Sequence, residues 1–207
     1  MTDLELHRWR DTFAGDNYYY GDEPGPVARR AMRYHRPLMP RGGTALDAGS
    51  GEGQDVAFLD ACGYEVTGVD FTPEGVEKTR RLVPHSPQTT IVRADLRHWM
   101  PPQRYDLVIA VNALQFLGLD APAVLRKLQD ATAPGGVFGF SAFAREADEP
   151  ALQGTLYRWT PDELMTTFDQ PTFSRWQPLE TARLWQWRSD GTSQPFVTLI
   201  ARRGEEP

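Results

Sequence analysis

The chain has 207 residues, of which 40% are hydrophobic and 24% charged, a balance that indicates a folded protein of about one domain rather than a disordered chain. It carries 22 basic and 28 acidic residues, a formal charge of −6, which argues against general nucleic-acid binding because phosphate backbones require a basic surface. The single cysteine, Cys62, excludes an internal disulfide, the four scattered histidines show no metal-ligand spacing, and no apolar run approaches the about 20 residues of a membrane span.

Residues 1–38 are predicted to be helical and amphipathic, interrupted by the aromatic, glycine-rich stretch Gly15–Gly25. From about residue 43 to 143, strand and helix patterns alternate. The expected strands are Thr44–Ala48, Glu65–Asp70, Thr89–Arg93, Tyr105–Val111 and Val137–Phe143, and the expected helices are Gln54–Cys62, Pro73–Leu82 and Asp120–Ala131. Thr72 is the expected N-cap of the second of these helices. Ala133–Gly136 is predicted to form a turn.

The alternation predicts a parallel sheet with helices on both faces, because parallel strands need helical crossovers. A further helix, Thr160–Phe168, precedes two strand-like runs, about Thr172–Trp187 and Pro195–Arg202. A turn at Ser189–Gly191 makes this pair an antiparallel hairpin. We therefore expect one domain, with a helical, aromatic cover at 1–38, a ligand-binding core at 43–143, and a C-terminal helix and hairpin at 144–207.

A glycine-rich turn lies between the first strand and its helix, in Leu46-Asp47-Ala48-Gly49-Ser50-Gly51-Glu52-Gly53. Glycine lets the backbone turn sharply and lets a ligand approach it closely, and the following helix directs its N–H groups at that ligand. Taken alone, such a turn is equally a tight connection between two elements.

Two further acids indicate that this turn belongs to a ligand site. Asp70 ends the second strand, where a carboxylate can accept hydrogen bonds from both ribose hydroxyls of an adenosine-type ligand. Asp95 follows the third strand, where it can accept from an adenine amino group. Each acid has an alternative role as a turn or capping residue, but three acids at three successive strand ends favour a ligand site.

With these motifs, residues 40–145 resemble the class I S-adenosylmethionine-dependent methyltransferases. The resemblance implies a Rossmann-like, seven-stranded sandwich, mostly parallel, and S-adenosyl-L-methionine as cofactor, with S-adenosyl-L-homocysteine as product. It assigns the ribose to Asp70 and the adenine side to Asp95, Phe71 and Leu96. The remaining cofactor positions that it implies are Asp47, Ala48, Gly49, Ser50, Gly51 and Gly53 in the loop and Asn112 beside the methionine portion.

Finer similarity indicates a branch. Leu6-His7-Arg8-Trp9, Gly51-Glu52-Gly53-Gln54-Asp55 and Gly63–Asp70 look like thiopurine S-methyltransferases, and Tyr105–Leu117 also looks like tellurite-resistance methyltransferases. The resemblance implies that Trp9 lies over the cofactor and that the acceptor is a small molecule with a soft sulfur, selenium or tellurium atom. Phe13 stands where a second tryptophan is common. Neither a catalytic residue nor a metal is implied, nor a nucleic-acid or membrane partner, and we expect a monomer or homodimer.

Two other functions share these features. A nicotinamide-dependent oxidoreductase has the same glycine turn and ribose acid, although Asp47 and Asp95 count against it. A non-catalytic module that only binds S-adenosylmethionine is the second alternative. The polar N-terminus, MTDLELHRWRD, is unlike a signal peptide, so we expect a cytoplasmic protein.

The remaining candidates have ordinary structural explanations. Cys62 is expected to be a small core residue, Trp99 to pack beside the adenine pocket or simply in the core, and Arg145 to be solvated or ion-paired rather than to face an anionic acceptor. Tyr18–Tyr20 form either an aromatic lid or a partly buried loop cluster. Aromatic density in residues 1–25 suggests a cover that excludes water from the site.

Overall fold

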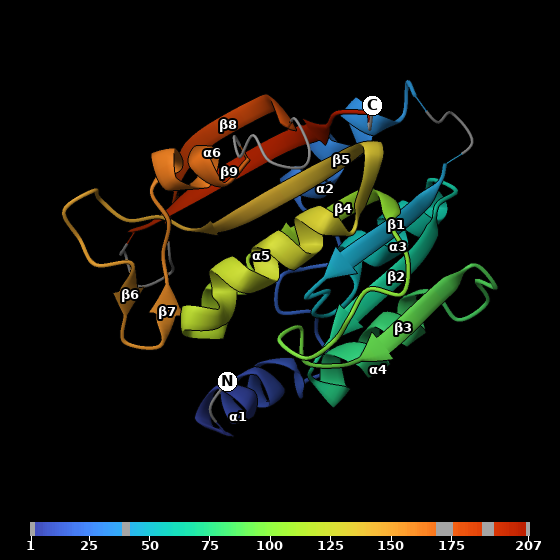
Figure 1. Cartoon of the computed structure of the whole chain (residues 1–207). Coiled ribbons are helices and arrows are strands. Elements are labelled where there is room, and N and C mark those ends of the chain that lie inside the picture. The colour runs from blue at the N-terminus through green and yellow to red at the C-terminus, as the bar shows by residue number, and fades with distance from the viewer. Residues whose placement is uncertain (1–2, 39–41, 169–175, 188–192, 206–207) are drawn as a thin grey trace.

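The computed structural model describes residues 3–38, 42–168, 176–187 and 193–205. Its centre is a seven-stranded sheet in the order β3-β2-β1-β4-β5-β9-β8, shown in Figure 1. The strands are β1 (Thr44–Ala48), β2 (Glu65–Asp70), β3 (Thr89–Arg93), β4 (Tyr105–Val111), β5 (Thr132–Phe143), β8 (Trp176–Trp187) and β9 (Ser193–Arg203). The first five run parallel, and β9 and β8 are antiparallel, which confirms the predicted sandwich with a C-terminal hairpin.

The predicted helices form, and two of them begin at capping side chains. They are α1 (Asp3–Phe13), α2 (Pro26–His35), α3 (Gln54–Ala61), α4 (Pro73–Leu82), α5 (Ala121–Asp130) and α6 (Pro161–Phe168). Thr72 caps α4 as predicted, because its side chain accepts a hydrogen bond from Gly75 N at 3.2 Å. Thr160 and Glu163 form a reciprocal capping box at the start of α6, over 3.1 and 3.0 Å. No helix in these ranges is both long and apolar enough to cross a membrane.

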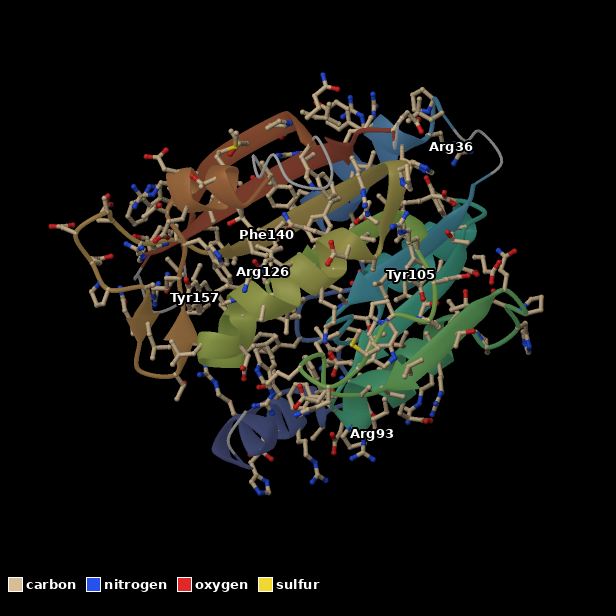
Figure 2. The ribbon with its side chains drawn as sticks, in the orientation of Figure 1. Arg36, Arg93, Tyr105, Arg126, Phe140 and Tyr157 are labelled. Atoms are coloured by element: carbon tan, nitrogen blue, oxygen red, sulfur yellow. The ribbon has the colours of Figure 1, made fainter. Side chains whose placement is uncertain are left out.

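Helices cover both faces of the sheet and enclose two cores. On one face α5 and α6 pack over the sheet, and on the other α2 and α3 do (Figure 1). Tyr105 on β4 and Phe140 on β5, both labelled in Figure 2, are fully buried. β4 lies at the centre of the sheet and is covered on both faces, so it is hydrophobic along nearly its whole length, as its sequence predicted.

The predicted turn at Ala133–Gly136 is wrong, because this segment lies inside β5. Tyr105 pairs with Thr132, whereas Leu107 already pairs with Val137, so the residues between them loop out as a bulge. Gly135 has a φ of +75°, a turn-like conformation that glycine favours. The local turn chemistry is therefore present, but the strand continues to pair on both sides of it.

The C-terminal hairpin forms as expected between β8 and β9. Its predicted turn, Ser189–Gly191, and the first residues of the predicted run, 172–175, lie outside the described residues. Two further features had no prediction. A 3-10 helix, η1 (Leu114–Asp120), follows β4, and the short strands β6 (Leu152–Gln153) and β7 (Leu156–Tyr157) form a small hairpin that contacts it.

Candidate functional site

A cavity of about 540 Å³ opens at the carboxyl ends of the parallel strands, on the side of the sheet edge where α1 lies in Figure 1. This is the edge at which open α/β sheets bind ligands. All the predicted cofactor residues line it except Ala48 and Gly53. The parallel topology therefore brings together residues that are far apart in the sequence.

The loop between β1 and α3 requires glycine at two positions that line the cavity. Gly49 has a φ of +84°, and a Cβ there would lie 2.3 Å from Ala113 Cβ, so a side chain would push the β1 and β4 loops apart. Gly51 has a φ of +53°, but its missing Cβ would meet only Phe13 Cζ, at 3.6 Å. Gly49 thus serves packing, whereas Gly51 keeps the backbone open towards the cavity.

Ala48 and Gly53 do not line the cavity, and both have packing contacts; their predicted contact with the cofactor stays a prediction. Ala48 is fully buried in the core. Gly53 precedes α3 with a φ of +93°, and a Cβ there would lie 2.6 Å from Thr79 Cγ2. The third glycine of the motif therefore allows α3 and α4 to pack closely.

Asp70, at the end of β2, organises the glycine loop as well as lining the cavity. Its Oδ2 accepts from Gly51 N at 2.9 Å, and its Oδ1 accepts from Thr72 N at 2.8 Å and from Thr72 Oγ1 at 2.6 Å. Burial raises the pKa of this carboxyl, and the hydrogen bonds from Thr72 and Gly51 oppose that rise. Each oxygen keeps lone-pair capacity for a ligand hydroxyl.

Asp47 is the most unusual acid of the site. It is 2% exposed, and its Oδ2 has no hydrogen-bond partner within the described residues. Burial, followed by the charges of Asp55 and Asp70, raises its pKa well above the ordinary value. Asp55 lies nearby on α3 and accepts from Gly25 N at 2.6 Å. An unpaired, buried carboxylate oxygen beside two further acids is suited to a cationic ligand group.

The predicted adenine side is arranged around Asp95, which lines the cavity with Phe71 and Leu96. Its carboxylate is held by Arg97, whose Nε lies 3.1 and 3.0 Å from the two oxygens and whose Nη2 lies 2.5 Å from Oδ2. Arg97 N also donates to Oδ1 at 2.9 Å. These bonds fix the orientation of the acid that the sequence predicts for this edge.

Asn112, the first residue after β4, has a strained backbone. Its φ is +52°, and it is the one non-glycine residue with positive φ among the described residues. Its Oδ1 accepts from Ser141 Oγ at 2.8 Å, and its N donates to Ser141 O at 2.9 Å. Both residues line the cavity, so β5 fixes Asn112 in its wall, and the contact of Asn112 with the methionine portion stays a prediction.

Helix α1 covers part of the cavity through Trp9 and Phe13. The Trp9 ring lies 5.3 Å from Phe13 and 4.9 Å, edge to face, from Phe116 of η1. On the outside of the helix, Arg10 Nε lies 3.0 Å from Glu74 Oε1 on α4. The N-terminal segment therefore contributes two aromatic side chains to the wall of the cavity, while its role as a cover and its movement stay predictions.

A buried ion pair anchors the loop that follows α1 and contains Tyr18–Tyr20. Lys78 Nζ on α4 lies 2.7 Å from Glu52 Oε1, with side chains only 6% and 0% exposed. Glu52 Oε2 accepts from Tyr19 N at 2.7 Å, and Lys78 Nζ also donates to Asn17 O at 2.8 Å. These bonds anchor the backbone of the loop, but the side chains of Tyr19 and Tyr20 are exposed and Tyr20 lines the cavity, so the lid and the loop cluster both stay predictions for Tyr18–Tyr20.

The candidates expected to be structural have structural contacts. Cys62 and Trp99 are partly buried against the two cores. Arg145 is ion-paired with Glu163 and donates to the carbonyls of Glu146 and Glu149. None of the three lines the cavity. Within the described residues, no cluster of histidine, cysteine or acidic side chains could hold a metal ion.

Several cavity residues had no prediction. Among them are the acids Glu23 and Asp55, Phe116 on η1, Ser141 on β5, Trp185 on β8, and Phe196 and Thr198 on β9. The hairpin residues lack a sequence signal, because aromatic side chains favour either face of a strand. Phe116 falls within Tyr105–Leu117, the segment that resembles tellurite-resistance methyltransferases, and this resemblance is the signal that could have found it.

Residues 45–136 match the family model of a methyltransferase domain. The chain is 33% identical over 147 residues to trans-aconitate 2-methyltransferase of Azoarcus sp. (strain BH72), a match that covers 69% of this chain and 53% of that protein. The chain spans about half the length of the curated relatives that it matches.

Two solved structures share the fold. TehB from Haemophilus influenzae superposes with a TM-score of 0.70 at 19% identity, over 88% of this chain and 62% of that one. The N-methyltransferase NodS from Bradyrhizobium japonicum WM9, in complex with S-adenosyl-L-homocysteine, also has a TM-score of 0.70, at 16% identity, over 97% and 98%. With the domain match, the strand order and the glycine loop between β1 and α3, the chain belongs to the class I S-adenosylmethionine-dependent methyltransferases.

Proposed function

We propose that the chain binds S-adenosyl-L-methionine in this cavity and transfers its methyl group to a small molecule. The observation that carries the proposal is the buried, unpaired Oδ2 of Asp47, which lines the same cavity as the glycine loop that follows it in the chain. The methionine portion of the cofactor bears an ammonium group, which would provide the missing partner. A nicotinamide dinucleotide lacks such a group, and the methyltransferase domain match also counts against that alternative.

The remaining contacts extend the proposal along the cofactor. Asp70 would accept the ribose hydroxyls, Asp95 and Phe71 would meet the adenine, and Asn112 and Trp9 would flank the methyl end. Bound there, the cofactor supplies an electrophilic sulfonium methyl. The protein would accelerate transfer chiefly by holding nucleophile and methyl at near-attack distance and by excluding water.

The narrower part of the proposal is a soft acceptor atom. Its support is the lack of a free base at the cavity. No histidine in the described part of the chain lines it, and each acid that does is either assigned above to the cofactor or already bonded, Glu23 to Arg29, Glu52 to Lys78 and Asp55 to Gly25 N. Oxygen and nitrogen acceptors that must lose a proton during transfer usually need a base, whereas polarisable atoms such as sulfur do not.

Titration of the purified chain with S-adenosyl-L-homocysteine in a calorimeter tests cofactor binding directly. We expect saturable one-to-one binding, with NAD⁺ and NADP⁺ producing no heat. Methyl transfer to any acceptor then distinguishes an enzyme from a module that only binds the cofactor. Binding of a dinucleotide in place of S-adenosyl-L-homocysteine would contradict the proposal.

Gly51→Val should abolish cofactor binding while the fold survives. The branched side chain would project into the cavity beside the predicted cofactor path, and the left-handed φ costs about 1–2 kcal/mol of stability. Gly154→Val is the matched control, since Gly154 has a similar φ of +63° with nothing within 4 Å of its missing Cβ. Calorimetry should show affinity lost in the first variant and kept in the second. An equal loss of affinity in both variants would show that backbone strain, and not the side chain in the cavity, causes the effect.

Cofactor affinity should increase as the pH rises above the ordinary carboxyl range. Because the pKa of Asp47 is raised in the fold, its ionised form costs stability, so the free protein loses stability as pH rises through that pKa. The cofactor's ammonium favours the ionised form, so binding should tighten over the same range. Dissociation constants for S-adenosyl-L-homocysteine at pH 5 and 7.5 check this. Asp47→Asn should flatten the dependence, and Asp130→Asn, on the exposed end of α5, should not.

A further inference from the structure

Three backbone carbonyls in the turn that follows β3 converge on one side chain. Lys127 Nζ on α5 donates to Leu96 O, to Trp99 O at 2.8 Å and to Arg97 O at 3.3 Å. An ammonium group has three N–H donors, and here three acceptors surround it. Each of these bonds is strengthened by the charge of the lysine, so the turn is anchored to α5 along most of its length.

The helix that carries this lysine is firmly packed. Leu125 and Leu128 of α5 are fully buried in the core, and Val124 is nearly so. Lys127 lies between them in the sequence and is half-buried. The place of its ammonium group is therefore set by the packing of α5 on the sheet rather than by the turn.

The N–H groups of the turn are bonded mainly to Asp95. Arg97 N donates to Asp95 Oδ1 at 2.9 Å, and His98 N and Trp99 N donate to Asp95 O at 3.0 and 2.8 Å. Leu96 N, by contrast, donates to no group among the residues that the structure describes. Asp95 and Leu96 both line the cavity. Adjacent residues of the cavity wall therefore offer one carboxylate and one free N–H.

Two constraints hold the backbone at Leu96. Its side chain is buried in the core, where Cδ1 lies 4.0 Å from the place that a Cβ on Gly49 would take. Its carbonyl is bound by Lys127. With the side chain and the carbonyl of one residue fixed, the tetrahedral geometry at Cα fixes the position of its nitrogen as well. Removal of the Lys127 ammonium would release one of the two constraints.

We propose that Lys127 is a positioning residue for cofactor recognition, which holds Leu96 N and the Asp95 carboxylate at the spacing that selects adenine over other purine bases. The inference rests on the proposed function. Adenine has a ring nitrogen that accepts a hydrogen bond beside an amino group that donates one, and an N–H beside a carboxylate is the complement of this pair. Hypoxanthine has the opposite pattern, which would place donor against donor and acceptor against acceptor.

Two ligands that differ only at this edge of the base test the inference. S-adenosyl-L-homocysteine and S-inosyl-L-homocysteine share the ribose and the amino-acid portion. Calorimetry gives their dissociation constants for the unchanged full chain and for Lys127→Met. We expect the unchanged chain to prefer the adenine ligand at least a hundredfold. In Lys127→Met the adenine ligand should bind about tenfold more weakly and the inosine ligand should change less than twofold, so the preference falls about tenfold.

Arg126→Met is the matched control, because Arg126, labelled in Figure 2, precedes Lys127 on α5 and is exposed. It should change neither dissociation constant more than twofold. Thermal melting of each variant separates a loss of folded protein from a loss of affinity. Lys127→Gln keeps a polar side chain that water can solvate, so it replaces Lys127→Met if that variant folds poorly, and it should lower the preference in the same way.

Two results would overturn the proposal. One is an unchanged preference for the adenine ligand in the Lys127 variants. The other is an equal loss of affinity for both ligands, which would make Lys127 a purely structural contact between α5 and the turn.

Failure of this inference is separable from failure of the proposed function. If S-adenosyl-L-homocysteine binds the unchanged chain but the Lys127 variants keep the full preference, the cofactor site stands and the role of Lys127 is wrong. If S-adenosyl-L-homocysteine does not bind the unchanged chain, the proposed function fails, and this inference fails with it.

Discussion

Asp70→Ala is expected to weaken binding of S-adenosyl-L-homocysteine about a hundredfold. The change removes a buried carboxylate that would accept from two ribose hydroxyls, and each charge-assisted bond contributes about 1.5 kcal/mol or more. It also removes the acceptor for Gly51 N, which holds the glycine loop in place. Since about 1.4 kcal/mol corresponds to a tenfold change in affinity, two such bonds account for the expected loss. Calorimetry gives the dissociation constant.

Thr72→Ala is the matched control, because Asp70 also has a structural role. It removes the hydroxyl that donates to Asp70 Oδ1 and caps α4, at a cost of about 1 kcal/mol of stability, while the carboxylate remains. Thermal melts should therefore show both variants destabilised, with affinity lost only in Asp70→Ala. Unchanged affinity in Asp70→Ala would remove the ribose assignment. An equal loss of affinity in both variants would show that Asp70 acts only by holding the glycine loop in place.

Lys78→Met should cause the largest loss of stability of any single change considered for this protein. Glu52 would remain as a buried charge with no countercharge, and breaking such a pair costs about 3–5 kcal/mol. For a chain of this length the melting temperature should fall by roughly 6–20 °C. Differential scanning calorimetry without ligand measures the change.

A double-mutant cycle separates the pair from its surroundings. Glu52→Gln keeps an acceptor oxygen for Tyr19 N, so the double variant Glu52→Gln/Lys78→Met should recover much of the stability lost in Lys78→Met alone. Arg81→Met on the same helix, whose partner Glu77 is more than half exposed, is the control and should change the melting temperature little. Additive effects of the two substitutions would show that the pair contributes nothing as a unit.

The same contacts bear on the predicted cover. Residues 17–25 are tied to the core by Glu52 and Lys78, by Gln54 Nε2 donating to Gly21 O at 2.6 Å, and by Gly25 N donating to Asp55. Helix α1 is held by ring contacts of Trp9 and Phe13 and by the exposed pair of Arg10 with Glu74. The opening movement that the sequence suggests for residues 1–25 stays a prediction. Because residues 17–25 are hydrogen-bonded to the core, we expect any such movement to involve α1.

The sequence by itself determined the parallel core and the chemistry of its edge. Periodicity located β1 to β4 and their helices within a residue or so, because burial on one or both faces imposes a repeating apolar pattern. The positions of Asp47, Asp70 and Asp95 followed from it, since each ends or follows a strand and parallel strands bring those ends to one edge. Sequence periodicity and capping thus sufficed for elements whose conformation depends on residues close together in the chain.

Only the tertiary structure decided the contacts between segments distant in the sequence. The Glu52–Lys78 pair depends on how the glycine loop before α3 packs against α4, and no spacing in the sequence indicates it. Trp185 and Phe196 face the cavity because of the register in which β8, β9 and β5 pair. Alternating residues of a strand lie on opposite faces of the sheet, but the sequence does not show which face meets a ligand. The bulge at 133–136 arises because β5 keeps pairing with β4 on both sides of a turn-forming sequence. Packing between distant segments therefore positions Trp185 and Phe196 in the cavity wall, whereas the local sequence pattern predicts the residues proposed for the cofactor.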